Sequence, residues 1–259
     1  MTKIWAISTN KGGVLKTSIT TNLAGALSKE GRVLIVDTDN QGNAALTFGR
    51  NPDELQTTLY DVLVDGADLR KTIINAHRNI DILPSNDDMA FFEFDVLSNR
   101  DQYPQPFSLL KNALQSVLDQ YDYVLIDTPP NLGLVCGMVL SCATGVLIPF
   151  QPESYSMRSL VKILKAMDDF KAKHNPDLAV LGVVATLVDQ RTVLHSQVLQ
   201  ECRKFCQQKG IRMLDTVIPR SVRFASSVAY ERLPATLTES NNSVVGNYFD
   251  LLKEVKHVG

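Results

Sequence analysis

The sequence predicts an α/β fold with a doubly wound, mainly parallel sheet. Two observations support this class: short apolar, β-prone runs recur along the chain, and stretches of helical length separate them. This alternation is typical of βαβ units, whose parallel strands are buried on both faces. The 259 residues, 44% of them hydrophobic, can form a large core. We therefore expect a single domain over residues 1–259.

The first expected strand spans residues 3–8, and a helix follows the loop after it. In that helix Ile19, Leu23, Ala26 and Leu27 recur at helical spacing up to Gly31, which suits a C-terminal cap. The later apolar runs predict strands at residues 32–37, 80–83, 123–127, 145–150 and 181–186.

A glycine-rich loop, Asn-Lys-Gly-Gly-Val-Leu-Lys-Thr-Ser at residues 10–18, joins the first strand to the first helix. Backbone N–H groups in such a loop, together with a helix N-terminus, favour phosphate oxygens. Lys16 can reach the outer phosphates, and the Thr17 hydroxyl can bind Mg²⁺. The general phosphate-loop pattern is not met, because Asn10 and Leu15 occupy its glycine positions. A plain glycine turn therefore stays open for this loop alone.

Two of the expected strands end in acidic residues. Asp37 and Asp39 lie at the end of one strand, with the same side-chain parity on an extended chain, and Asp127 precedes a Pro-Pro turn at the end of another. Each aspartate alone could be a helix cap or a turn former. Since the carboxyl ends of parallel strands meet at one edge of a sheet, the three motifs predict one shared site there.

Together the motifs resemble those of the deviant Walker A ATPases of the ParA/Soj partition group. The likeness rests on Lys-Gly-Gly-x-x-Lys-Thr with its extra Lys11, Val-Asp-x-Asp-x-Gln-Gly-Asn, and Ile-Asp-x-Pro-Pro. Residues 146–153, 189–192 and 218–223 are similar to later family segments, so the likeness covers nearly the whole chain. It implies a MinD/ParA-like P-loop fold. Because the chain starts on its first strand, we expect the short form without an N-terminal helix-turn-helix domain, and no signal peptide.

The resemblance implies a weak ATPase that converts ATP and water to ADP and phosphate. Lys16 would hold the β and γ phosphates, and Asp39 would position the attacking water. Thr17 and Asp127 would hold Mg²⁺, with Asp37 supporting the metal. The loop residues implied to contact ATP or ADP are Lys11, Gly12, Gly13, Val14, Leu15, Lys16, Thr17 and Ser18.

The resemblance also implies an ATP-dependent homodimer. Lys11 would cross to the nucleotide of the partner subunit and so act in catalysis there, which makes the nucleotide part of the interface. Pro219 and Ser221 belong to the segment implied to contact the base.

DNA is the second implied partner. The whole chain has a net charge of −2, but residues 186–259 hold ten Lys and Arg against seven Asp and Glu. The family likeness implies nonspecific binding of double-stranded DNA at or beside Arg191, Arg220 and Arg223, although solvated surface arginines would give the same pattern. It further implies a ParB-like centromere-binding partner that stimulates hydrolysis through a short basic segment. The cargo stays open between a plasmid, a chromosome and a protein assembly.

Two other functions remain as alternatives. A MinD-like positioning ATPase would use an amphipathic C-terminal helix on a membrane, and residues 244–259 do alternate apolar and charged side chains. Lys253 and Lys256 are offset by Asp250 and Glu254, however, so we favour packing of this helix on the domain over a membrane contact. No apolar run is long enough to span a bilayer, and we expect a cytoplasmic, nucleoid-associated protein.

The second alternative is a nucleotide-dependent scaffold with negligible hydrolysis, and it depends on Leu15. A positive φ at this residue would cost about 1–2 kcal/mol, whereas a helical conformation would cost little. The four cysteines show no metal-ligand spacing, so we expect buried free thiols, with Cys202 and Cys206 on one helix face.

Overall fold

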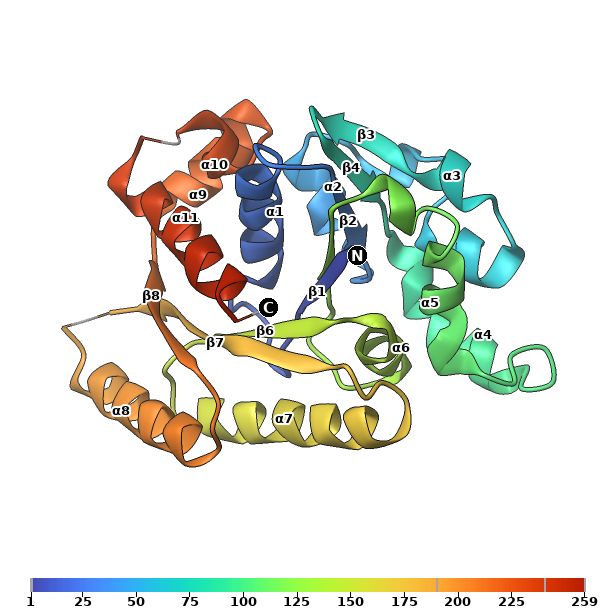
Figure 1. Ribbon diagram of the computed structural model, residues 1–259. Coiled ribbons are helices and arrows are strands. Elements are labelled where there is room, and N and C mark those ends of the chain that lie inside the picture. The colour runs from blue at the N-terminus through green and yellow to red at the C-terminus, as the bar shows by residue number, and fades with distance from the viewer. Residues whose placement is uncertain (1, 190, 240, 259) are drawn as a thin grey trace.

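The computed structural model describes residues 2–189, 191–239 and 241–258, and a β-sheet runs through its centre (Figure 1). Within these residues, eight strands pair in the order β3-β4-β2-β5-β1-β6-β7-β8. All neighbours are parallel except β3 and β4. The predicted fold class is confirmed. The strands are β1 (Lys3–Ile7), β2 (Val33–Asp37), β3 (Ile74–His77), β4 (Ile80–Leu83), β5 (Tyr123–Asp127), β6 (Gly145–Phe150), β7 (Ala179–Val188) and β8 (Met213–Pro219).

Helices cover both faces of the sheet and enclose two hydrophobic cores. Alternation along β1 divides them, because Ile4 and Ala6 point into one core and Trp5 and Ile7 into the other. In Figure 1, α1 and α11 lie above the sheet and α7 and α8 below it. The α-helices are α1 (Lys16–Leu27), α2 (Asn43–Thr47), α3 (Leu69–Thr72), α4 (Phe92–Ser98), α5 (Leu109–Leu114), α6 (Leu134–Cys142), α7 (Ser156–Lys173), α8 (Val193–Gln208), α9 (Val222–Ser226), α10 (Ala235–Thr238) and α11 (Ser243–Lys256).

All six expected strands are present, and the sequence analysis missed two more. The missed strands, β3 and β8, form the two edges of the sheet. Both are half-buried rather than continuously apolar, and β8 ends in a proline. Edge strands have less apolar surface to bury, so their sequence signal is weaker.

The expected end of the first helix was wrong. Helix α1 stops at Leu27, and Ser28 follows with its N–H bonded to the carbonyl of Ala24. Gly31 lies beyond the helix and serves a different purpose. A Cβ on Gly31 would lie 2.4 Å from Oδ2 of Asp122, which accepts the backbone N–H of Arg32.

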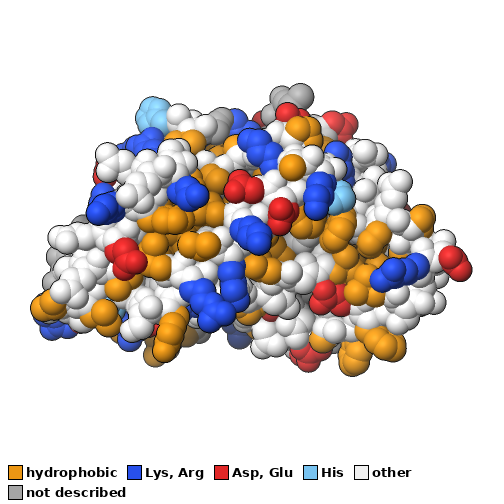
Figure 2. Space-filling model, turned by 90° about the horizontal axis from the view of Figure 1, so that it is seen from below, with side chains coloured by type: hydrophobic (Ala, Val, Ile, Leu, Met, Phe, Trp, Pro, Cys, Tyr) orange, Lys and Arg blue, Asp and Glu red, His pale blue; other side chains and the backbone are white. Residues whose placement is uncertain are grey.

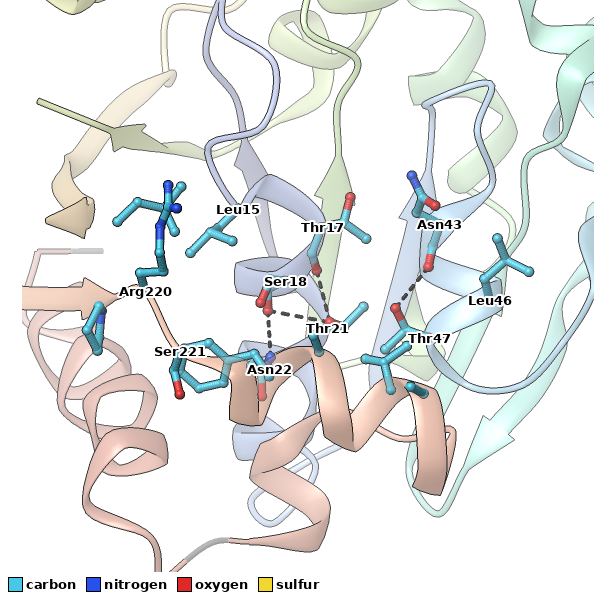
Figure 3. Close-up of a pocket in the computed structure, with 16 residues that line it drawn as sticks. Leu15, Thr17, Ser18, Thr21, Asn22, Asn43, Leu46, Thr47, Arg220 and Ser221 are labelled. Carbon is cyan, nitrogen blue, oxygen red and sulfur yellow. Dashed lines mark hydrogen bonds between the residues drawn. The ribbon is translucent and has the colours of Figure 1, made fainter. Parts of the chain in front are cut away.

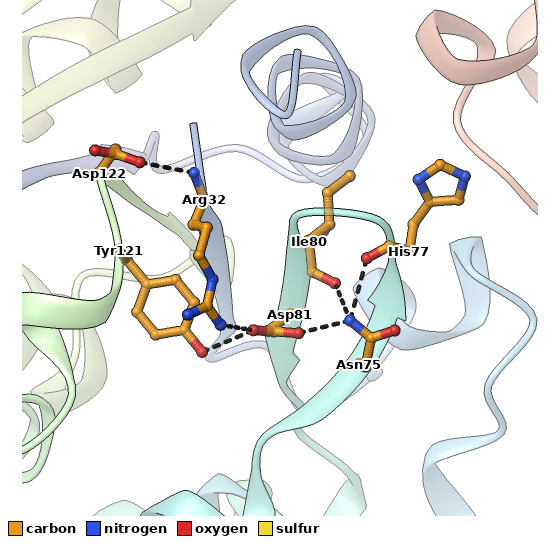
Figure 4. A network of polar contacts seen from close by, with 7 residues as sticks. All are labelled: Arg32, Asn75, His77, Ile80, Asp81, Tyr121 and Asp122. Atoms are coloured by element: carbon orange, nitrogen blue, oxygen red, sulfur yellow. Dashed lines mark hydrogen bonds and ion pairs between the residues drawn. The ribbon is translucent and has the colours of Figure 1, made fainter. Parts of the chain in front are cut away.

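A polar network ties the strands together at the edge of the sheet where β2, β4 and β5 begin (Figure 4). Asp81 of β4 is its centre. The Asp81 carboxylate accepts hydrogen bonds from Asn75 Nδ2 at 2.8 Å and from the Tyr121 hydroxyl at 2.9 Å, and it pairs with Arg32 Nη2 at 3.1 Å. The Arg32 guanidinium also lies over the Tyr121 ring. This network anchors the β3–β4 hairpin to the main sheet.

The C-terminal helix packs on the domain, as predicted. Val245, Tyr248, Leu251 and Val255 of α11 are fully buried against the core that α1 shares. Within the described ranges, no helix combines the length and apolar character that crossing a bilayer needs.

The predictions for the cysteines are also confirmed, since all four are buried free thiols. Cys202 and Cys206 lie on one face of α8 with their sulfurs 4.0 Å apart.

The face formed by α7 and α8 carries lysines and arginines among hydrophobic side chains (Figure 2). Exposed cations on α7 include Arg158, Lys162 and Lys165. Positive charge is therefore not confined to the C-terminal third of the chain.

Candidate nucleotide-binding site

The three sequence motifs meet at the carboxyl edge of the sheet. Asp127 at the end of β5 is in register with Asp37 of β2 on one side and Ile7 of β1 on the other. The glycine-rich loop leaves β1 at the same level and enters α1 at Lys16. The predicted convergence of motifs is thus observed, and it follows from the central positions of these strands.

The loop backbone turns through two left-handed residues. Gly13 and Leu15 both have φ of 70°, and Val14 between them is buried. Leu15 is the residue before α1, and its carbonyl accepts the N–H of Ile19 at 2.8 Å. Leu15 therefore has the positive φ and not the helical conformation. This backbone region favours glycine and is strained for leucine.

A cavity of about 340 Å³ opens over this loop. Asp39 lines it with the loop residues and with Asn43 and Pro130. The Lys16 ammonium donates to the Lys11 carbonyl at 3.1 Å, which holds the side chain against the loop. Burial lowers the pKa of Lys16 from its ordinary value, although the nearby Asp127 and Asp39 carboxylates oppose that shift. The lining thus combines a glycine-rich loop at a helix N-terminus with a buried lysine, a combination that suits phosphate oxygens.

Asp127 and Thr17 form the candidate metal site. The Thr17 hydroxyl donates to Asp127 Oδ2 at 2.5 Å, and the Thr20 hydroxyl reaches Oδ1 at 3.4 Å. Burial raises the pKa of Asp127 to about 7, against the opposing effects of the Thr17 hydrogen bond and the Lys16 charge. Within the described part of the chain, no cluster of three or more His, Cys, Asp or Glu could hold a metal by itself. One carboxylate and one hydroxyl suit Mg²⁺, which usually keeps waters and phosphate oxygens as further ligands.

Asp37 and Asp39 have different surroundings despite their shared strand-end motif. The Asp37 carboxylate is fully buried and accepts the N–H groups of Asp39 at 3.0 Å and Ala44 at 2.9 Å. Burial and the neighbouring Asp127 charge raise the pKa of Asp37 well above its ordinary value. Asp39 is half-buried and lines the phosphate-sized cavity, whereas Asp37 does not. Asp37 thus braces the turn that presents Asp39.

A second, mainly apolar cavity of about 490 Å³ adjoins the first (Figure 3). Leu15, Thr17, Ser18 and Asn43 line both cavities. The predicted base-contacting residues Pro219 and Ser221 line the second cavity, and so does Arg220, which was predicted to contact DNA. The other walls come from Thr21, Asn22, Leu46, Thr47, Leu187, Phe224, Ala225, Val228 and Ala229.

Lys11 does not point into either cavity. Its ammonium pairs with Glu153 Oε2 at 2.6 Å and donates to the Ser156 hydroxyl at 3.2 Å. Gln151 holds the other Glu153 oxygen at 2.6 Å. The Lys11 hydrogen bond is the main reason that the pKa of Glu153 is lowered. This chain therefore holds Lys11 at the start of its own α7.

Of the three predicted DNA-contacting arginines, two line one polar cavity of about 620 Å³, namely Arg191 and Arg220. Arg191 pairs with Asp189 at 3.1 Å and is 91% exposed, and Arg223 pairs with Glu239 at 3.5 Å. Among the described residues, Arg220 has neither a hydrogen bond nor an ion pair. Gln190, which belongs to the predicted late loop, lies outside the described residues.

Several residues at the site were not predicted, because they lie far along the sequence from the motifs that they contact. Glu153 and Ser156 are more than 140 positions from Lys11, and no local pattern links them. Phe224 and Val228 form the apolar wall from the helical segment after the predicted base-contacting residues. Asn43 is the last residue of the Val-Asp-x-Asp-x-Gln-Gly-Asn motif and the first residue of α2, so the motif itself was the available signal.

Comparison with known proteins agrees with this geometry. A family model described as an AAA domain matches residues 2–180. A ParA family protein from Mycoplasma pneumoniae is 34% identical over 260 residues, which cover 95% of this chain and 94% of that protein. The sporulation initiation inhibitor protein Soj of Bacillus subtilis is 36% identical over 257 residues, 98% of each chain.

A solved structure is similar along nearly the whole length. Cobyrinic acid a,c-diamide synthase from Mycobacterium smegmatis, with a bound ATP analogue and magnesium, superposes with a TM-score of 0.84. Its sequence is 28% identical, and the superposition covers 98% of this chain and 93% of that one. The predicted cofactors, ATP or ADP with Mg²⁺, agree with what that relative binds. The chain described here belongs to the ParA family of P-loop partition ATPases.

Proposed function

We propose that this protein is a DNA-partition ATPase of a single P-loop domain whose Mg-ATP-bound dimer binds DNA without sequence preference. Two adjoining cavities that share four lining residues carry the nucleotide-binding part of this proposal. A donor-lined cradle that opens through Leu15, Thr17, Ser18 and Asn43 into an apolar pocket suits a triphosphate joined to a nucleoside.

Hydrolysis would depend mainly on positioning and charge. Phosphoryl transfer has a loose transition state with its charge on phosphate oxygens, so Lys16 and the loop N–H groups would stabilise it directly. Thr17 and Asp127 would hold Mg²⁺, which supplies positive charge beside the β and γ phosphates. Asp39, which lines the cradle, would orient the attacking water.

Lys11 would couple nucleotide binding to dimer formation. It now pairs with Glu153 and Ser156, and in the dimer it would reach the phosphates of the partner subunit. The ion pair is partly exposed and therefore inexpensive to open. ATP would shift the population toward the dimer, and loss of the γ phosphate would reverse the shift.

The DNA contact would use Arg220 and, beside it, Arg191 and Arg223. A cytoplasmic, nucleoid-associated protein would result, with a ParB-like protein as the stimulating partner. Burial of the apolar side of α11 supports this reading over membrane attachment.

The test measures binding to a short, labelled DNA duplex of arbitrary sequence across a range of salt concentrations. We expect tight binding with Mg-ATP, weak binding with ADP, and a steep loss of affinity with salt, because each phosphate contact releases counterions. Arg220→Ala should flatten the salt dependence of DNA affinity. Arg78→Ala, which changes an arginine between β3 and β4, should not. Equal affinity in ADP and ATP, or a response independent of salt, would contradict the proposal.

A second candidate function is a nucleotide-dependent scaffold with negligible hydrolysis. The left-handed conformation of Leu15 supports this second candidate, because it places backbone strain in the loop where phosphate must bind. Release of phosphate from ATP in the presence of DNA distinguishes the two candidates, since a scaffold would show the dimer and no turnover.

A further inference from the structure

Tyr248 of the C-terminal helix α11 reaches the nucleotide site from within the core. Its side chain is fully buried, and its hydroxyl forms a hydrogen bond of 2.8 Å with the hydroxyl of Ser18. Ser18 follows Thr17 in the first turn of α1 and lines both cavities of the site, whereas Tyr248 lines neither. Any effect of Tyr248 on a bound nucleotide therefore passes through its neighbours.

The surroundings of the two hydroxyls set the direction of this hydrogen bond. Burial raises the pKa of Tyr248, so the phenol keeps its proton at neutral pH. Within the described ranges, Ser18 Oγ is the only hydrogen-bond partner of that phenol. If Ser18 donated, the buried Tyr248 proton would have no acceptor, which is unfavourable for a buried donor. Tyr248 is therefore the donor and Ser18 Oγ the acceptor, and the Ser18 proton stays available for another partner.

Tyr248 also keeps the Ser18 hydroxyl from bonding to its own helix. Serine and threonine hydroxyls in helices often donate to a carbonyl one turn back. The Thr20 and Thr21 hydroxyls of α1 do so, at 3.0 Å to the Lys16 carbonyl and 2.9 Å to the Thr17 carbonyl. The hydroxyl of Ser18, in the same helix, instead contacts Tyr248. Without Tyr248, it could turn back in the same way as its two neighbours.

Ser18 lies where the two cavities adjoin. It is half-buried, and it belongs to the four residues that line both the phosphate-sized cavity and the mainly apolar one (Figure 3). A nucleotide that filled both cavities would place the phosphate nearest its ribose at this junction. A hydroxyl with a free proton is a suitable donor to an oxygen of that phosphate.

The ring of Tyr248 supports the wall of the apolar cavity. It packs edge-on against Phe224, with 5.1 Å between the ring centroids and an interplanar angle of 67°. Phe224 lines the apolar cavity. Val245 and Leu251 of α11 are buried in the same core as Ile19 of α1, so the ring has little freedom to move. The ring and the hydroxyl thus have separate contacts at the site, and a substitution can remove one without the other.

We propose that Tyr248 is a positioning residue for the nucleotide, whose hydroxyl holds the Ser18 hydroxyl as a hydrogen-bond donor to the phosphate nearest the nucleoside. The inference rests on the proposed function, because it takes the two adjoining cavities as the nucleotide site. It adds to that site a side chain 230 positions from Ser18 in the sequence.

The test measures the affinity of the full-length protein for ADP with Mg²⁺ by isothermal titration calorimetry. Tyr248→Phe removes the hydroxyl and keeps the ring beside Phe224. We expect Tyr248→Phe to weaken ADP binding about threefold and Ser18→Ala about fivefold, as loss of one hydrogen bond does. The double variant should bind ADP like Ser18→Ala alone, since the Tyr248 hydroxyl acts only through Ser18.

Tyr121→Phe is the matched control, because it also removes the hydroxyl of a buried tyrosine. That hydroxyl donates to Asp81 at 2.9 Å, at the opposite edge of the sheet from the nucleotide site. Urea unfolding of each variant shows that it is folded at the temperature of the titration. Tyr121→Phe should bind ADP like the wild type even if its stability falls.

Unchanged ADP affinity in Tyr248→Phe would overturn the inference. So would a further threefold loss when Tyr248→Phe is added to Ser18→Ala, because Tyr248 would then act independently of Ser18. An equal loss in Tyr121→Phe would show a general effect of stability and would also contradict it. ADP binding needs neither DNA, a dimer nor turnover, so a failure of those parts of the proposed function would leave this readout intact.

Discussion

Leu15 occupies a backbone conformation that favours glycine, and this can be measured in the nucleotide-free protein. With φ at 70°, Leu15→Gly should be more stable than Leu15→Ala by about 1 kcal/mol, because both lose the leucine side chain and only alanine keeps the strain. Urea unfolding gives the two free energies. At Gln200, an exposed position within α8, the alanine variant should instead be more stable than the glycine variant, by about 0.5–1 kcal/mol. The same order at both positions would show that Leu15 is not strained.

Asp127 makes the stability of the metal-free protein depend on pH. Its folded pKa of about 7 lies above the ordinary value of 3.8, so the folded protein keeps a proton that the unfolded chain has released between these pH values. The contribution of Asp127 to the free energy of unfolding is therefore largest below about pH 4. It is lost as the pH rises through 7.

Asp127→Asn should remove that loss. We expect this variant to melt at a higher temperature than the wild type at pH 8 in EDTA, with a much smaller difference at pH 5. Asp119→Asn, a change at an exposed carboxylate, is the control. A variant that is equally destabilised at both pH values would contradict the assigned cause.

At the scale of elements, the Asp81 network holds the edge hairpin on the sheet, away from the nucleotide site. Asp81→Ala leaves the Tyr121 hydroxyl and the Asn75 amide without their acceptor, so we expect a loss of about 1–3 kcal/mol in the free energy of unfolding. ATP turnover by the folded protein should stay unchanged. Asp119→Ala should alter neither quantity, and a fall in turnover for Asp81→Ala at a temperature where it is folded would contradict this separation.

The elements that the sequence predicted well are those whose signal is local. Central strands such as β2 and β5 are continuously apolar and end in aspartate, so their positions and the meeting of their aspartates at one edge of the sheet could be predicted from composition and spacing. Edge strands β3 and β8 bury less surface and gave no comparable signal. The cap proposed at Gly31 failed because its requirement for glycine comes from Asp122, which is distant in sequence.

At the scale of the whole molecule, convergence of the three motifs followed from the rule that ligands bind at the carboxyl ends of parallel strands. The resting position of Lys11 did not follow, because its partners come from the start of α7 and only folding brings them near. The three motifs thus sufficed to predict where the site lies. The contacts of Lys11 with the start of α7 could be seen only in the structure.

The dimer switch is the central claim, and sedimentation velocity tests it most directly. Asp39→Ala, expected to retain ATP by slowing hydrolysis, should sediment as a dimer with Mg-ATP and as a monomer with ADP. Adding Lys11→Ala should abolish the dimer while nucleotide affinity stays within a few-fold, whereas adding Lys29→Ala should leave it intact. Dimers that persist without the Lys11 ammonium, or an Asp39→Ala protein that stays monomeric with Mg-ATP bound, would contradict the account.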